Sequence, residues 1–155
     1  MTESHEDHLH LLVCIDRLNG AWKTLNAVEA SGTHPLVGPA FRYALVEYAT
    51  AFTRSDGPLK RNRTLPLSLV PIDKQELHKR IIGARHQTHA HADLTALDAV
   101  LHVEYINGTK HVSHIQNQVH GLEELKNIVA IISLVESVLD NLYVMHRSSA
   151  KSIAP

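Results

Sequence analysis

Residues 100–116, VLHVEYINGTKHVSHIQ, decide the fold class of this chain. Apolar and polar side chains alternate along the segment, and this period of two is typical of a β-strand. The alternation is interrupted by Asn107-Gly108, which is the strongest short signal for a two-residue hairpin turn. Counting outward from the turn pairs Val103 with Val112 on one face. The segment therefore predicts a β-hairpin.

On both sides of the hairpin, apolar residues recur at steps of three and four, which predicts amphipathic helices. The expected helices span about residues 7–30, 38–54, 73–92 and 121–147. The third is expected to begin with a capping box formed by Asp73 and Glu76. The sequence therefore predicts a mainly α fold, a four-helix bundle-like domain with an inserted β-hairpin, as one domain over residues 1–155 with about 7–147 ordered.

The last predicted helix is apolar over a broad arc. Its apolar stripe consists of Leu125, Ile128, Ile132, Val135, Leu139 and Leu142. A helix of this kind is either central in a domain or packed against a second subunit. We therefore expect a homodimer.

Residues 53–72 are expected to form a long connection, which carries the basic residues Lys60, Arg61 and Arg63. Long loops inside compact domains are uncommon and are often functional. Lysine and arginine bind phosphate oxygens by charge-assisted hydrogen bonds. The segment is either a solvated loop or a loop that contacts phosphate.

The composition is that of a globular protein, with 44% hydrophobic residues, 20% charged residues and a net charge of −1. This balance gives no general sign of a nucleic-acid or membrane partner. Residues 1–10 are too polar for a signal peptide, and we expect no apolar run of the roughly 20 residues that a membrane span needs. Cys14 is unpaired and is expected to be a small buried apolar residue. We therefore expect a cytoplasmic protein without a membrane partner.

Titratable side chains are crowded in the last turns of the predicted third helix. At about 100° per residue, His78, Arg85 and His89 line one edge of its buried face, whereas His86 and His91 lie at other angles. A guanidinium and an imidazole that lie close together can bind a phosphate and move a proton. This is the minimum equipment for cleaving a phosphodiester.

Residues 85–91, RHQTHAH, resemble the motif of the HEPN superfamily, in which an arginine precedes a histidine by four to six residues near the end of a helix. Arg85 and His91 have five residues between them, and His86 is the polar residue that often follows the arginine. Residues 44–54 are similar to the second helix of HEPN-like proteins. The likeness covers about residues 20–95, and the predicted hairpin lies outside the minimal bundle of that family.

The resemblance implies a helical domain that often dimerises, with the motifs of two subunits meeting in one cleft. Many members are metal-independent endoribonucleases of toxin–antitoxin or antiviral systems, and others are non-catalytic binding modules. By this resemblance Arg85 would hold the scissile phosphate, and His91 would act as general acid or base. His86, His89 and His78 would be accessory, with His89 an alternative to His91 as the catalytic histidine. RNA and a cognate antitoxin protein are the implied partners, and no cofactor is expected.

Two other function classes compete with this interpretation. Metal ligands are available at His89, His91 and Asp93, with a second set at Asp7, His8 and His10. Residues two apart on a helix diverge by about 200°, so His89 and His91 cannot bind one ion while helical, and no metal is expected. The remaining alternative is a non-catalytic interaction or dimerisation module, which the apolar last helix also favours.

Overall fold

The computed structural model describes residues 3–59, 62–85, 100–115 and 122–150 of the chain. The helices are α1 (Glu3–Ala30), α2 (Val37–Ala51), α3 (Gln75–Ala84) and α4 (Ile128–Ala150), with 3-10 turns η1 (Leu67–Leu69), η2 (Ile72–Lys74) and η4 (Glu123–Asn127). The strands are β1 (Ser55–Asp56), β2 (Asn62–Arg63), β3 (Val100–Ile106) and β4 (Thr109–Ile115). The predicted fold class, mainly α with a β-hairpin, is confirmed.

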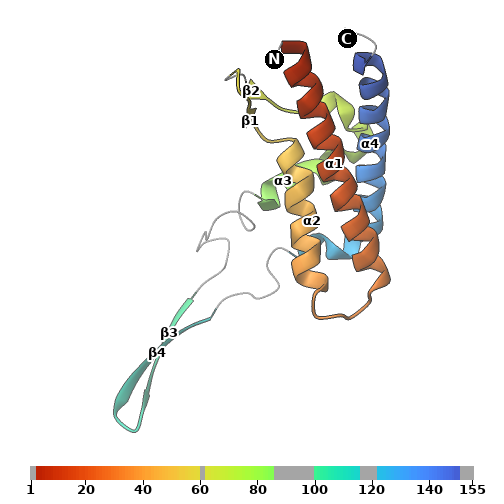
Figure 1. The fold of residues 1–155 in the computed structure, drawn as a ribbon. Helices are drawn as coiled ribbons and strands as arrows, with labels where there is room; N and C mark the ends of the chain where they lie inside the picture. The colour runs from red at the N-terminus through yellow and green to blue at the C-terminus, as the bar shows by residue number, and fades with distance from the viewer. Residues whose placement is uncertain (1–2, 60–61, 86–99, 116–121, 151–155) are drawn as a thin grey trace.

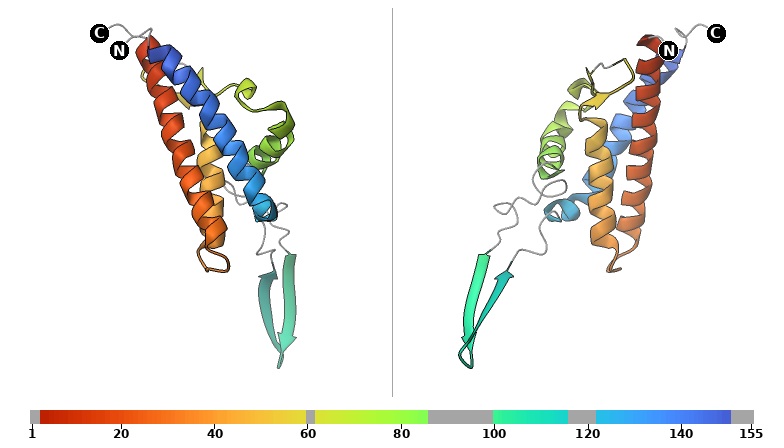
Figure 2. Two further views of the ribbon diagram at one scale, coloured as in Figure 1. Left: turned by 90° about the vertical axis from the view of Figure 1, so that its right-hand side faces the viewer. Right: turned by 60° about the vertical axis from the view of Figure 1, so that its left-hand side comes forward.

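The core lies between the three long helices, because α1 packs against both α2 and α4 (Figures 1 and 2). Apolar residues at three- and four-residue steps form the inner face of each helix. The largest fully buried side chains include Leu18, Leu25, Phe41, Leu45, Tyr48, Ile131, Leu134 and Leu142. Full burial of such a side chain contributes roughly 1.5–3 kcal/mol of favourable transfer free energy. This core holds the bundle together.

Helices α3 and α4 begin later than predicted, at Gln75 and Ile128. The capping box at α3 was wrong, because Asp73 lies in η2, Lys74 is the N-cap without a side-chain hydrogen bond, and Glu76 binds Lys79 at 2.7 Å instead. A 3-10 turn, η4, occupies Glu123–Asn127, so α4 begins only at Ile128. Residues 86–92 of the predicted third helix lie outside the described residues.

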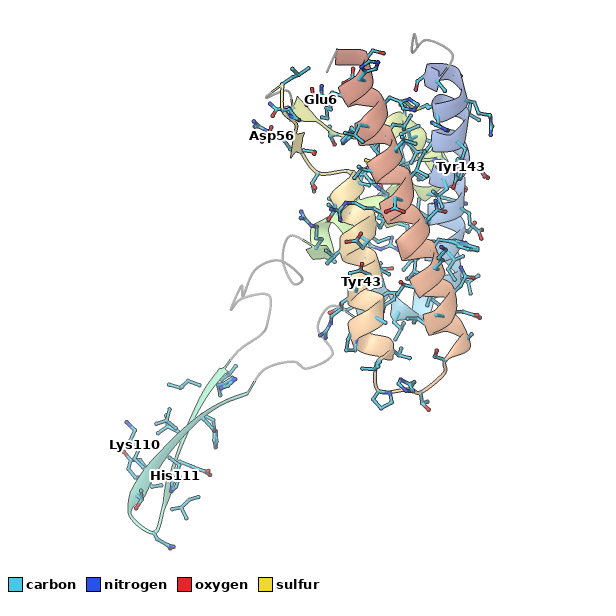
Figure 3. The ribbon with its side chains drawn as sticks, viewed as in Figure 1. Glu6, Tyr43, Asp56, Lys110, His111 and Tyr143 are labelled. Carbon is cyan, nitrogen blue, oxygen red and sulfur yellow. The ribbon has the colours of Figure 1, made fainter. Side chains whose placement is uncertain are left out.

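A short hairpin, β1–β2, replaces part of the long loop that was predicted for residues 53–72. It is held by the buried carboxylate of Glu6 in α1, which accepts hydrogen bonds from Arg63 Nη2 at 2.7 Å and from the Leu59 amide at 3.1 Å. Gly57 passes so close to this carboxylate that a Cβ there would collide with it. Figure 3 shows Glu6 beside the ribbon that carries Asp56. A distant helix therefore orders this connection.

The second hairpin, β3–β4, has the predicted register, with Val103 opposite Val112. Its turn uses Asn107 at φ 53° and Gly108 at φ 81°, the left-handed conformations that a type I′ turn needs at both central positions. Every described side chain of β3 and β4 is exposed. Figure 1 shows this hairpin lying apart from the helices.

The helical segment Glu123–Ala150 is long and apolar enough, by length and composition, to cross a membrane. We had expected no such segment from the sequence. The central helix of a globular protein satisfies the same criterion, and here Ile131, Leu134 and Leu142 are fully buried against the other helices. The core therefore accounts for the predicted apolar stripe, but only 33% of the most apolar 18-residue window of the segment is buried, and Val129 and Val144 of α4 are exposed.

Candidate functional site

Arg85 directly follows α3, and its backbone is still helical at φ −59° and ψ −45°. Its amide donates to the carbonyls of Ile81 and Ile82, so the last turn of the helix fixes the position of its Cα. The Nε atom of Arg85 is shielded from solvent and has no hydrogen-bond partner among the residues that the structure describes. Buried polar groups of proteins are normally paired, so this nitrogen is unusual.

Two other arginines of the bundle surface are engaged by carboxylates. Arg17 pairs with Glu47 at 3.0 Å, and Arg80 pairs with Glu124 at 2.6 Å. The Arg80 hydrogen bond is the main cause of the lowered pKa of the Glu124 carboxyl. Arg85 makes no such ion pair within residues 3–59, 62–85, 100–115 and 122–150. Its charge is therefore not neutralised by a described acid.

The three motif histidines, His86, His89 and His91, lie outside the described residues. The structure thus places the arginine of the motif at the end of α3 but gives no geometry for its histidines.

His78, the remaining predicted accessory residue, is buried and turned toward α2. Its Nδ1 atom lies 2.8 Å from Tyr48 Oη, within hydrogen-bonding distance, and its ring meets Phe52 edge-on at 4.6 Å between centroids. Burial lowers the pKa of His78, because the charged imidazolium would lose solvation there. His78 is therefore a neutral, positioned imidazole.

An apolar cavity of about 490 Å³ opens beside His78 and the end of α3. It is lined by Phe52, Leu65, Leu67, His78, Lys79, Ile82 and Gly83. Lys79, the one charged residue in this lining, is paired with Glu76. The cavity has room for a small, largely apolar group. Gly83, in its lining, lies two residues before Arg85 along the chain.

Arg63 is the described member of the predicted basic cluster; Lys60 and Arg61 lie outside the described residues. Its guanidinium donates to Asp7 Oδ1 and Glu6 Oε2, both at 2.7 Å, and its side chain is only 9% exposed. The hydrogen bond to Asp7 is the largest cause of its raised pKa. Asp7 and Glu6 thus accept hydrogen bonds from the guanidinium N–H groups that Arg63 would need to bind a phosphate.

A second cavity, of about 790 Å³, lies beside this ion pair at the end of the bundle where α1 begins and α4 ends. Within it, His8 Nδ1 lies 2.6 Å from Ser149 Oγ, and the His8 ring packs 5.0 Å from that of His146. Sequence reasoning missed this contact between the two ends, because no local signal joins residues so far apart.

Metal binding finds no support in the described part of the chain, where no three suitable side chains gather around one point. His10 lies 3.6 Å from Cys14 Sγ, and burial, followed by the charge of Arg63, lowers its pKa. Cys14 is buried, as expected, and burial raises the pKa of its thiol to about 11. The thiol therefore stays protonated at neutral pH.

No family model matches this chain, and neither does any curated protein or solved structure. The likeness of residues 85–91 to the HEPN motif therefore stays a resemblance.

Proposed function

We propose that this protein cleaves single-stranded RNA without a metal ion, with Arg85 binding the scissile phosphate and His91 transferring protons. The observation that carries the proposal is the guanidinium of Arg85, which begins an R-x5-H motif at the end of α3 and has no acidic partner among the described residues. An arginine without a carboxylate partner is available to an anionic ligand.

Cleavage of RNA requires a group that binds the phosphate and a group that transfers protons. The planar guanidinium can donate two hydrogen bonds to the phosphate oxygens and stabilise the charge that develops on them. The 2′-hydroxyl attacks phosphorus and loses its proton, while the bond from phosphorus to the 5′-oxygen breaks and that oxygen gains a proton. An imidazole is suited to either transfer, because its pKa lies near neutral pH. The products are a 2′,3′-cyclic phosphate and a 5′-hydroxyl.

The test is cleavage of fluorogenic RNA in EDTA by purified wild-type protein and variants. His91→Ala should lower the rate about 10²-fold or more, the usual size of a general acid–base contribution. Arg85→Ala should lower it about 10²-fold or more as well, because it removes donors that stabilise the developing negative charge. Arg85→Lys keeps the positive charge but lacks the planar guanidinium that can donate two hydrogen bonds. Its cleavage rate should therefore lie between those of wild type and Arg85→Ala. Circular dichroism and urea unfolding establish that each variant is folded.

Two controls make the result specific. RNA with 2′-O-methyl groups should stay intact, because it lacks the attacking hydroxyl. His89→Ala decides between the two histidines, since loss of activity there, with His91→Ala active, would reassign the proton transfer to His89. A panel of RNAs left intact in EDTA by the wild-type protein would refute the nuclease.

The second candidate function is a non-catalytic interaction module. It is favoured by the β3–β4 hairpin, in which the apolar side chains of residues 100–114 are exposed. Stable self-association without any RNA cleavage would support this alternative. A cognate antitoxin protein remains a proposed partner for the nuclease.

A further inference from the structure

The β3–β4 hairpin exposes apolar side chains that a folded protein normally covers. Leu101 is 68% exposed, Val103 43%, Tyr105 70% and Val112 57%. A ribbon of two strands is only marginally stable alone, whereas three or more strands with an apolar face can be stable. Among the described residues, β3 and β4 form a two-stranded sheet, so each has one open edge, without a described neighbouring strand. The hairpin is therefore incomplete as a sheet.

The open edge of β3 presents a defined set of backbone groups. In an antiparallel pair, opposite residues alternate between exchanging hydrogen bonds and not exchanging them, and the pair that closes a two-residue turn exchanges them. Counting from Ile106 and Thr109, which flank the turn, the residues with free N–H and C=O groups are Leu101, Val103 and Tyr105. These groups can pair with another strand.

The open edge of β4 is less suited to pairing with itself. It carries Lys110, His111 and His114, and lysine on an edge strand opposes strand addition. Figure 3 shows Lys110 and His111 on the part of the hairpin far from the helices. Antiparallel pairing of β4 about Val112 would also place Lys110 opposite His114 of a second copy, so two basic groups would meet.

The sequence of β3, in contrast, is complementary to itself about Val103. An antiparallel pairing centred there places Tyr105 opposite Leu101 of the partner subunit, and Ile106 opposite Val100 of the partner subunit. Glu104 comes to lie opposite His102 of the partner subunit, on both sides of the centre. Within one chain, His102 Nε2 lies 3.8 Å from Glu104 Oε2, on the same face. In this pairing, each Glu104 carboxylate would face the imidazole of His102 of the partner subunit across the new ladder.

Neighbouring registers are worse by the same criterion. Centring the pair on Glu104 places two carboxylates directly opposite one another, which is destabilising. Centring it on His102 sets the two imidazoles opposite each other and leaves Glu104 facing Val100 of the partner subunit. In the register centred on Val103, the central residue also has its free backbone groups on the open edge, so it can exchange hydrogen bonds with its copy.

We propose that the open edge of β3 binds the same edge of a second copy of this chain, antiparallel and about a twofold axis at Val103. The product is a four-stranded sheet with strand order β4-β3-β3-β4. All copies of Leu101, Val103, Tyr105 and Val112 then lie on one face of this sheet, because residues opposite each other in a ladder point to the same side. The proposal does not depend on the nuclease activity.

The test is the mass of the full-length chain by light scattering between about 1 and 100 μM, a range that spans typical weak dimers. Wild type should approach twice the 17.2 kDa chain mass. Val103→Pro removes an outward N–H and should give a monomer. Val112→Pro is the matched control, because it makes the same change at the opposite position on the β4 edge, and it should stay dimeric.

Charge exchange tests the register. Glu104→Lys sets a lysine opposite His102 of the partner subunit and should raise the dimer Kd about tenfold, since two pairs are changed per dimer. The double variant His102→Glu with Glu104→Lys restores opposite charges and should recover most of the affinity. If the charges acted only through the net charge of the chain, the dimer Kd of the double variant would differ from that of wild type, because the double variant is one unit more positive.

Amide hydrogen exchange distinguishes this interface from any other. The amides of Val103 and Tyr105 should be protected in wild type at high concentration. In Val103→Pro, where residue 103 has no N–H, the Tyr105 amide should be unprotected. A wild-type monomer throughout the concentration range, a Val103→Pro dimer, or a dimer in which these amides exchange freely would each overturn the proposal.

Discussion

The helical bundle and the β3–β4 hairpin treat the same residue types in opposite ways. Tyr48 and Leu134 of the bundle are fully buried, whereas Tyr105 and Leu101 of the hairpin are 70% and 68% exposed. Burial of apolar area drives folding, so exposed apolar side chains contribute little to the stability of their own chain. The difference is the observation on which the proposed pairing of β3 with a second copy rests.

Polar groups differ between the two regions in the same way. In the bundle, the Lys74 ammonium in η2 donates to Ser133 O, Ser133 Oγ and Ser137 Oγ at 2.7–2.9 Å, which ties η2 to α4. In the hairpin, the outer backbone groups of β3 meet no other strand within residues 3–59, 62–85, 100–115 and 122–150. The Lys74 ammonium thus has its hydrogen-bond partners within the bundle, whereas the outer backbone groups of β3 have none among the described strands.

The largest expected effect is on core leucines. Leu134→Ala should lower the free energy of unfolding by about 2–5 kcal/mol, because it removes buried methyl groups and leaves a cavity. Leu101→Ala should change it by less than about 0.5 kcal/mol, as is usual for surface positions. Both are measured by urea unfolding in the Val103→Pro background, so that association does not contribute. Equal losses would show that the hairpin belongs to the cooperative fold.

A smaller effect is expected where a buried polar pair is broken. Tyr48→Phe removes the hydroxyl that lies 2.8 Å from His78 Nδ1 and should cost about 1–3 kcal/mol, because a buried imidazole nitrogen loses its partner. The matched control is Tyr143→Phe, which removes an exposed hydrogen bond from Asn19 and should cost much less. Comparable losses in urea would contradict the importance assigned to the buried pair.

The pH dependence of stability follows from the lowered pKa of His78. Below the ordinary histidine value of about 6.5, the unfolded chain binds a proton that the folded chain does not, so stability should fall as the pH falls. The slope from this residue can reach about 1.4 kcal/mol per pH unit and no more. His78→Gln should flatten the dependence between pH 6.5 and 5 in urea titrations. His10, whose pKa is also lowered, acts in the same direction, and an unchanged slope would place the effect there.

The smallest expected effect compares two glycines. A Cβ at Gly83 in α3 meets no atom within 4 Å, so Gly83→Ala should stabilise the bundle by up to about 1 kcal/mol through helix propensity. Gly108, at φ +81°, sits in the hairpin turn, and Gly108→Ala strains it. The second substitution should leave the thermal unfolding of a monomeric background unchanged while weakening hairpin pairing. A fall in melting temperature there would couple the two regions.

Local signals predicted the β3–β4 hairpin, because a turn and an alternating pattern need only neighbouring residues. The register followed from Asn107-Gly108 alone. The β1–β2 hairpin was missed, because its order depends on Glu6, which lies 53 residues from Leu59 along the chain. The capping box failed for a related reason, since Asp73 is taken up by the 3-10 turn η2 before α3 begins.

The residues of the candidate site also divide into those whose place depends on local sequence and those whose place depends on the packing of distant elements. Periodicity placed Arg85 within a helix expected over about residues 73–92, and the structure places it directly after Ala84, the last residue of α3. The burial of His78 against Tyr48 could not be predicted, because the two side chains meet only when α2 and α3 pack together. The carboxylate partners of Arg63 were likewise invisible, because they come from α1.

The side-by-side packing of α1 and α4 bears on how the protein is made (Figure 2). These are the first and last helices of the described chain, and contacts between distant segments form late, because a long loop must close first. During synthesis, α2 can pack on α1 early, but the part of α1 that packs against α4 stays uncovered until α4 has left the ribosome. A nascent chain halted before Ile128 would therefore lack the α4 side of the core, which includes Leu134 and Leu142, and would be a substrate for chaperones and proteases.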